Sequence, residues 1–457
     1  MAQPYLLPLS EALLAASGKM RVDLGVSSAV EAVRLAARAC AEAAPLVMAC
    51  VQPLCALVGL WLFVRYLVLN IDWTKDLCDV GYQYACEGAR GRRRGRRDAV
   101  REVRRQRKLG RLPPVYPNGW FAVLEGDRLR PGQVQHVSAL GENLAVFRAA
   151  DGGGRVHVLD AYCPHLGANM AVGGAVRGDC LECPFHGWRF RGDDGRCASI
   201  PYTDKVPEIA KVRRWESCEV NGLVFVWYHA EGEPPSWRPE QLPQLADGSW
   251  RYRGRSEFLI NAHIEEIPEN GGDIAHLNAI HGPSLLAGSD LRTYERLWLS
   301  FARHVWAADW APNTQPGRTH TATMNVRHEL RLFGKIPIVS MKVKANQIGP
   351  GYVVMNMETS IGSMVFLQCV TPLEPLLQKV IHRIFCPPHM FLYANIALIG
   401  EAIMFERDIM VWNHKKYEDK PLLVKEDRAI SKHRRWYSQF YSENSPQFSF
   451  VRENMEW

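Results

Sequence analysis

The chain contains C-P-H at residues 163–165 and C-P-F-H at residues 183–186, and these two stretches decide much of its fold. Cys163 and His165 lie two residues apart, Cys183 and His186 lie three apart, and seventeen residues separate the halves. Two cysteines and two histidines in this order are typical of a Rieske [2Fe–2S] centre, in which one iron takes both thiolates and the other both imidazoles. We therefore expect these four residues to bind such a cluster within a small β domain.

A structural zinc site is the alternative, because it uses the same ligand atoms. In a zinc finger, however, both cysteines come first and both histidines last, whereas each half here carries one of each. Each half is also followed by a glycine, Gly167 or Gly187, which lets two loops approach a shared cluster closely. The pattern favours the iron–sulfur cluster and indicates one-electron transfer.

The net charge of +7 is concentrated in one segment of the 457-residue chain. Between Arg90 and Lys108, eleven basic and two acidic residues give +9, so the remaining chain carries 7 − 9 = −2. A basic run can bind nucleic acid, but this one closely follows an apolar stretch. We expect anionic headgroups as its partner and no nucleic acid. A solvated helix or a disordered linker remains open.

That apolar stretch spans residues 43–64 without a charged residue. At about 1.5 Å per residue, a helix of this length reaches across a hydrocarbon core of roughly 30 Å. A buried soluble helix is the alternative. The flank after residue 64 is far more basic than the flank before it, so the positive-inside rule places the C-terminal bulk in the cytosol. The spacing of apolar residues at 28–42 predicts a short amphipathic helix before the span.

A second candidate metal site lies in the C-terminal half, where Asp273, His276 and His281 form D-x2-H-x4-H. Asp273 and His276 are spaced to share one face of a helix. His281 does not share it, but Gly282-Pro283 stops a helix there. Two histidines and a carboxylate with open positions suit mononuclear non-haem Fe(II) and O2.

The carboxylate ligand should come from elsewhere in the chain. Residues 396–417 predict an apolar helix that contains Glu401, Glu406 and Asp408. A carboxylate in such a helix is costly unless it is paired or bound to a metal. Asp408 is the predicted ligand and Glu401 the alternate on nearly the same face. A solvated, salt-bridged face with Arg407 and Lys415 is the other interpretation of Glu406 and Asp408.

At these residues the chain resembles the α subunits of Rieske non-haem iron oxygenases, over about residues 116–417. The resemblance implies an α+β fold, with a Rieske β domain followed by a helix-grip, START-like antiparallel-sheet domain. It implies iron ligands at His276, His281 and Asp408. It also implies that Asp273 bridges a cluster histidine of the neighbouring subunit to an iron histidine. A head-to-tail homotrimer follows, because the cluster and iron of one chain are too far apart for fast transfer.

Within this family, the block from Cys163 to Trp188 and the segment Cys197-Ala198-Ser199-Ile200-Pro201-Tyr202 are most similar to the Neverland-type cholesterol 7-desaturases. These are animal proteins with an N-terminal membrane segment. Bacterial 3-ketosteroid 9α-hydroxylases are the next resemblance. The resemblance therefore implies introduction of the C7–C8 double bond of cholesterol, giving 7-dehydrocholesterol. A steroid hydroxylase is the alternative.

Two other classes of protein fit less well. Membrane-anchored Rieske electron carriers brace their cluster with a disulfide, but Ala168 and Phe185 stand at those positions. A carrier also has no need of two hundred further residues with an iron triad. A sterol-transfer module with a dead iron site would need a broken triad, and His276, His281 and Asp408 are all present.

The expected organisation follows: an N-terminal segment (1–42), a transmembrane helix (43–64), a basic linker (65–114), the Rieske domain (115–235) and the catalytic domain (250–457). No G-x-G-x-x-G follows a predicted strand, so electrons from NAD(P)H should arrive through a separate reductase. The expected partners are O2, a sterol and a membrane. The expected location is a single-pass anchor, in the endoplasmic reticulum, with the catalytic domains facing the cytosol.

Overall fold

The computed structural model describes residues 54–87, 95–150, 154–293 and 301–448. It divides into two units, residues 1–64 and 65–457. In the described part of the first unit, an apolar helix begins at Leu54. The helix predicted at 28–42 and the first half of the span predicted at 43–64 lie outside the described residues. Among those that are described, one helical stretch is long and apolar enough to cross a membrane, Pro388–Trp412, and it lies in the second unit.

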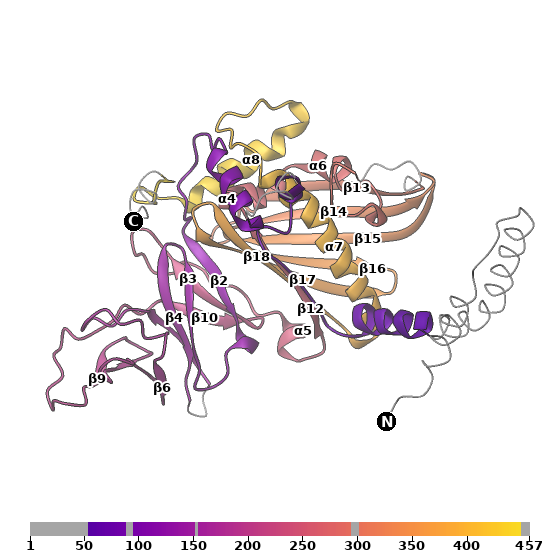
Figure 1. Cartoon of the computed structure of the whole chain (residues 1–457). Helices are drawn as coiled ribbons and strands as arrows, with labels where there is room; N and C mark the ends of the chain where they lie inside the picture. The colour runs from indigo at the N-terminus through magenta and orange to yellow at the C-terminus, as the bar shows by residue number, and fades with distance from the viewer. Residues whose placement is uncertain (1–53, 88–94, 151–153, 294–300, 449–457) are drawn as a thin grey trace, which may run out of the picture. The chain divides into compact units, whose positions relative to one another are not determined.

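The Rieske part of the second unit is built from three small antiparallel sheets (Figure 1). The six residues of β11 are all buried, as expected of a run of β-branched and aromatic side chains. Asn221-Gly222, both with positive φ, join β10 to β11 in the two-residue turn that this dipeptide favours. The strands are β2 (Gly119–Glu125), β3 (Val134–Ala139), β4 (Glu142–Arg148), β5 (Val156–Asp160), β6 (Ala175–Arg177), β7 (Cys180–Glu182), β8 (Arg189–Arg191), β9 (Cys197–Ser199), β10 (Ser217–Val220) and β11 (Leu223–Tyr228).

The catalytic part is one eight-stranded sheet in the order β1-β12-β18-β17-β16-β15-β14-β13. Its long strands pair antiparallel, as the predicted antiparallel-sheet domain requires. The strands are β12 (Arg251–Ile260), β13 (Ala302–Pro312), β14 (Thr321–Leu332), β15 (Ile336–Ile348), β16 (Tyr352–Thr359), β17 (Gly362–Glu374) and β18 (Leu377–Cys386).

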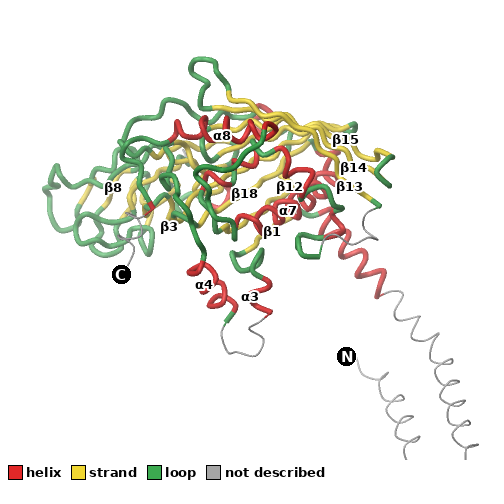
Figure 2. The backbone as a smooth tube through the Cα atoms, turned by 90° about the horizontal axis from the view of Figure 1, so that it is seen from above, coloured by secondary structure: helices red, strands yellow, loops and turns green. Residues whose placement is uncertain are grey.

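The segment predicted as a basic linker is instead folded into this unit. Within it, β1 (Ile71–Lys75) pairs in parallel with β12 at the edge of the large sheet. The short helices α3 (Gln83–Glu87) and α4 (Arg96–Gln106) follow and lie against each other (Figure 2). Val100 of α4 is buried among Leu77, Cys78 and Tyr82, which explains why the run is ordered there. For the basic run, α4 corresponds to the alternative of a solvated helix.

A single long helix, α7 (Phe391–Trp412), lies across the large sheet (Figure 1). It starts and ends five residues earlier than the predicted helix 396–417, after Pro387-Pro388 at its N-terminal end. Ala394 and Leu398 pack into the core with Phe366 and Ile384 of the sheet. The remaining helices are α5 (Pro243–Ala246), α6 (Ile274–Ala279) and α8 (Arg428–Tyr437).

The Rieske and catalytic parts share a core. Trp120 and Phe225 of the first pack in one buried cluster with Tyr352 and Leu367 of the second. Thr371 Oγ1 of β17 donates a hydrogen bond to the carbonyl of Ala122 in β2 at 2.7 Å. The two parts are therefore held together by a common apolar interior rather than by a flexible connection.

Candidate metal centres

The four residues predicted to bind the cluster lie in two loops of similar backbone conformation. Cys163 and His165 follow β5, and Cys183 and His186 connect β7 to β8. The amide of Gly167 donates to the carbonyl of Cys163 at 2.9 Å, and the amide of Gly187 donates to the carbonyl of Cys183 at 3.0 Å. The Cβ of any other residue at Gly187 would lie 2.8 Å from Pro201. Pro201 belongs to neither cluster loop, and a Cβ at Gly167 would meet nothing within 4 Å. The positive φ of both residues, 74° and 71°, is what favours glycine at these positions.

The loop tips bring the predicted ligands together. The rings of His165 and His186 have centroids 4.7 Å apart, and His165 also stacks on Trp188 at 4.7 Å. Both cysteines are buried, and the Sγ of Cys183 neighbours that of Cys163. The Nδ1 atom of His165 is buried without a hydrogen-bond partner. An imidazole nitrogen left in this way suits a metal ligand, because a buried polar atom otherwise costs free energy.

The protein alone does not favour the thiolate of Cys163. Burial, followed by the neighbouring Cys183, raises the pKa of the Cys163 thiol to about 11. Since only the thiolate binds a metal, the charge needed to stabilise it has to come from the bound ion itself. The burial thus fits a cluster held in an apolar shell.

A second group of possible ligands gathers at the edge of the large sheet. Ligand atoms of His276, His281 and Asp408 all lie within 4.8 Å of one another, the sole such group of three in the part of the chain that the structure describes. His281 Nε2 lies 3.2 Å from Asp408 Oδ1, and both residues are buried. His281 Nδ1 and Asp408 Oδ1 make no hydrogen bond. Two imidazoles and a carboxylate with orphaned buried atoms are chemically suited to a divalent iron.

Local backbone structure positions the two histidines. Asp273 is the N-cap of α6 rather than part of the helix, so the predicted shared helical face is replaced by a cap. Its Oδ1 accepts from the amide of His276 at 3.3 Å, and its backbone oxygen contacts His276 Nδ1. Gly282-Pro283 follows the end of α6, and His281 lies in the turn before it, as predicted.

Arg407, next to Asp408, holds this turn in place. Its side chain is fully buried, and it donates to the carbonyls of Ile280, Pro283 and Ser284 at 3.0 Å each. The solvated-face interpretation of this part of the helix was therefore wrong. No local sequence pattern signals this role, because the partners of Arg407 are backbone carbonyls of a distant loop.

The other two carboxylates of α7 have different partners. Glu406 accepts from Trp73 Nε1 at 2.9 Å and from Ser289 Oγ at 2.7 Å, which ties α7 to β1. Glu401 Oε1 lies 2.6 Å from His382 Nδ1, and Glu401 is not in the group with His276 and His281. Of the three candidates, Asp408 is the one that the structure brings to the histidines.

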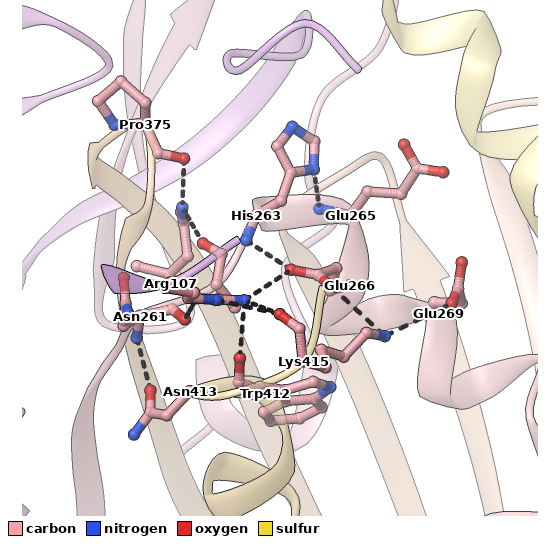
Figure 3. A network of polar contacts seen from close by, with 12 residues as sticks. Arg107, Asn261, His263, Glu265, Glu266, Glu269, Pro375, Trp412, Asn413 and Lys415 are labelled. Carbon is pink, nitrogen blue, oxygen red and sulfur yellow. Dashed lines mark hydrogen bonds and ion pairs between the residues drawn. The ribbon is translucent and has the colours of Figure 1, made fainter. Parts of the chain in front are cut away.

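A polar network fixes the end of α7 beyond Asp408 (Figure 3). Arg107, a residue of the basic run, is largely buried and donates to the carbonyls of Trp412 at 3.1 Å and Lys415 at 3.0 Å. Its Nη2 lies 4.0 Å from Glu266, which also lies 3.5 Å from Lys415. The network joins the C-terminal end of α7 to the segment that leads into Asp273, so Arg107 is a structural cation.

The three clustered side chains open into a cavity of about 390 Å³ between α7 and the large sheet. Its wall is mainly apolar, with methionines, aliphatic residues and tryptophans from five strands and from α7; it includes Trp306, Met341, Val343, Met355, Met357 and Met404. Near the histidines, His304 Nδ1 and His328 Nε2 are hydrogen-bonded at 2.7 Å. Burial lowers the pKa of His304 to about 3 and that of His328 to about 4, so this pair is neutral.

Comparisons with known proteins identify the two domains. The model of the Rieske [2Fe-2S] domain matches residues 119–210, and that of the 3-Ketosteroid 9alpha-hydroxylase C-terminal domain matches residues 226–441. Among solved structures, dicamba monooxygenase bound to 3,6 dichlorosalicylic acid has a TM-score of 0.51 at 15% identity. It covers 72% of this chain and 98% of that chain, which shows a shared fold.

Curated relatives are more similar in sequence. Cholesterol 7-desaturase nvd of Xenopus laevis is 52% identical, covering 80% of this chain and 81% of the relative. Cholesterol 7-desaturase nvd of Hemicentrotus pulcherrimus is 45% identical, covering 85% and 81%. Probable 3-ketosteroid-9-alpha-monooxygenase, oxygenase component, of Rhodococcus rhodochrous is 30% identical, covering 75% and 84%. This chain, with its Rieske domain and its cavity beside two histidines and an aspartate, is an oxidoreductase that belongs to the Rieske oxygenase family of the cholesterol 7-desaturases.

Proposed function

We propose that this protein desaturates cholesterol at C7–C8 to give 7-dehydrocholesterol. The observation that carries the proposal is the position of His276, His281 and Asp408 at the wall of a large apolar cavity. A sterol nucleus is apolar and rigid, so such a cavity can bury it and select which C–H bonds lie near the metal. Relatives that are 52% and 45% identical to this chain are named for this reaction.

The proposed ligands are those identified above. Cys163, His165, Cys183 and His186 hold the [2Fe–2S] cluster, and His276, His281 and Asp408 hold Fe(II). An Fe(II) ion held there would supply the O2 chemistry needed to break an unactivated C–H bond, with electrons from the cluster. The overall reaction balances as sterol, O2, two electrons and two protons giving the diene and two waters. The neutral His304–His328 pair keeps positive charge away from the metal, and the apolar wall excludes water.

Electrons are proposed to reach the cluster from NAD(P)H through a separate reductase. The histidines of the cluster loops lie beside exposed apolar side chains, with Leu166 65% and Phe185 61% exposed. The exposed end of these two cluster loops is therefore suited to docking on another protein surface. We propose a homotrimer in which this tip meets Asp273 of a neighbouring subunit, so that Asp273 links the two metal centres.

The protein is proposed to take its sterol from a membrane, anchored by the segment at 43–64 in the endoplasmic reticulum with the catalytic part in the cytosol. An exposed apolar rim supports this proposal; it consists of Phe333, Ile336, Ile338, Ile361, Leu392 and Ile396. Ile396 also lines the cavity. Leu69, near the point where the chain enters the 65–457 unit, is fixed to α7 by a 2.8 Å hydrogen bond from Asn395.

A steroid hydroxylase is the second candidate, favoured by the match of residues 226–441 to the 3-Ketosteroid 9alpha-hydroxylase C-terminal domain. The metal ligands do not distinguish the two reactions, because loss of a second hydrogen gives an alkene and oxygen transfer gives an alcohol. Incubating the purified protein with cholesterol, O2 and a surrogate electron source tests the proposal. We expect the diene; an alcohol as the sole product supports the hydroxylase.

A further inference from the structure

The cavity wall carries a second set of polar side chains, away from the proposed iron ligands. Gln368 of β17 and His382 of β18 are directly opposite each other in the sheet. Glu401 of α7 lies against both: its Oε1 is 2.6 Å from His382 Nδ1 and 3.5 Å from Gln368 Nε2. Gln368 and Glu401 line the cavity, and His382 is fully buried behind them.

One oxygen of this set has no partner in the protein. Glu401 Oε2 is buried without a hydrogen bond, although the side chain as a whole is 17% exposed. A buried carboxylate oxygen in an apolar wall is costly unless a donor reaches it. The Glu401 side chain lines the cavity, and its 2.6 Å contact with His382 Nδ1 holds the carboxylate in place.

The separation from the proposed iron site matches a sterol. Glu401 and Asp408 are seven residues apart on α7, so they face the same side about 10 Å apart along the helix. Standard bond lengths place the oxygen of a 3β-hydroxyl roughly 6 Å from C7. The hydrogen bond adds roughly 2.8 Å, so the span from the carboxylate to C7 is roughly 9 Å, of the same order as the separation along α7.

We propose that Glu401, positioned by His382 and Gln368, accepts a hydrogen bond from the 3β-hydroxyl of the substrate and thereby sets which carbon meets the metal. This inference rests on the proposed function and adds a specificity-determining residue to it. A hydroxyl can donate to the Glu401 carboxylate and accept from the Gln368 amide. A 3-ketone has no hydrogen to donate and brings a second acceptor against the carboxylate. The site should therefore favour 3β-hydroxysterols over 3-ketosteroids.

The test compares two ligands and two variants. Equilibrium binding of cholesterol and of its 3-keto counterpart, delivered from cyclodextrin, is measured by quenching of tryptophan fluorescence, since Trp306, Trp310 and Trp412 line the cavity. The wild-type full chain should bind the hydroxysterol about tenfold more tightly or better. Glu401→Gln keeps the side-chain size and supplies an amide donor, so the preference should fall to within about threefold. Gln368→Leu makes the same comparison if the first variant does not fold.

Met404→Leu is the matched control, because it changes an apolar cavity residue on the same helix and should leave the preference intact. An unchanged preference in Glu401→Gln, or in Gln368→Leu where that variant replaces it, overturns the inference. Product analysis separates this failure from failure of the proposed function. In the first case wild-type protein still forms the diene from cholesterol, and in the second case it does not.

Discussion

Asp408 Oδ1 lies 3.2 Å from Nε2 of His281, although one residue lies near the end of the long helix and the other in a turn far earlier in the chain. The contact depends on Arg407, whose buried guanidinium binds the carbonyls of that turn. Arg407 and Asp408, neighbours on α7, thus both contribute to the site, in different ways. Arg407 holds the loop, and Asp408 presents a carboxylate to its histidines.

Replacing Asp408 by Ala should remove the mononuclear iron and leave the cluster. The loss of one of three ligands should weaken iron binding by at least about 100-fold, more than the loss of a supporting contact does. Iron and acid-labile sulfide analysis, with EPR of the reduced cluster, measures both centres. Glu401→Ala is the matched control and should keep both metals. If Glu401→Ala loses the iron and Asp408→Ala does not, the assignment of the third ligand is wrong.

Replacing Asp273 by Asn should slow electron transfer and keep both metals. Asn is as good an N-cap as Asp, so α6 should retain its position while the charge is lost. Single-turnover oxidation of the reduced cluster by O2 in the presence of substrate should be at least about tenfold slower. Asp290→Asn, on the loop after the site, is the control for loss of a carboxylate. Equal rates in wild type and Asp273→Asn would remove the proposed bridge.

Glu265 should make the protein less stable as pH rises. Burial, then the nearby Glu269, raises the pKa of Glu265 from its ordinary 4.5 to about 7 in the folded state. The folded state therefore holds a proton that the unfolded state loses, and stability falls between about pH 4.5 and 7. The cost above pH 7 is at most about 3 kcal/mol.

Glu265→Gln should remove this dependence. Its thermal unfolding midpoint should exceed that of wild type at pH 8 by several degrees more than at pH 5. The buried histidines that titrate in the acidic range are present in both proteins, so they cancel in the comparison. The same difference in midpoint at pH 5 and pH 8 would show that Glu265 does not carry the proton.

The apolar rim should contribute to membrane binding after the N-terminal unit is removed. Deletion of residues 1–64 should release most of the protein from membranes and leave a folded 65–457 unit. Residual binding to phospholipid vesicles should fall at least tenfold further in Phe333→Asp/Ile338→Asp, since burying such side chains contributes about 1.5–3 kcal/mol each. Leu422→Asp, fully exposed outside the rim, is the control. Equal vesicle binding by the rim and control variants would contradict the role of the rim.

The orientation of the anchored protein is tested separately with sealed microsomes. Protease added outside should digest the catalytic part if it faces the cytosol. Protection of that part would reverse the proposed orientation.

The two metal motifs could be predicted from the sequence because their ligands are close together in the chain. The Cys163–His186 block and the Asp273–His281 segment each fix their own spacing. The third ligand needed a tertiary contact. Glu401 and Asp408 lie on one face of α7, and their different partners depend on where each turn of the helix crosses the sheet.

Other features depend on contacts that no local pattern encodes. The strand β1 is short, and it exists because Gly254 and its neighbours in β12 supply a parallel partner. Arg107 belongs to a run of basic residues, yet its side chain is largely buried because its guanidinium donates to the carbonyls of Trp412 and Lys415. Tertiary contacts determine the pairing of β1 and the burial of Arg107, whereas the composition of this segment predicts only a basic linker.

The most direct measurement is sterol analysis by mass spectrometry in cells that lack 7-desaturase activity and express this chain. The account predicts a new sterol two mass units below cholesterol, with the ultraviolet absorption of a conjugated diene, and its disappearance in His281→Ala. A hydroxylated sterol as the sole product, lost in the same variant, would contradict desaturation and support the steroid hydroxylase instead.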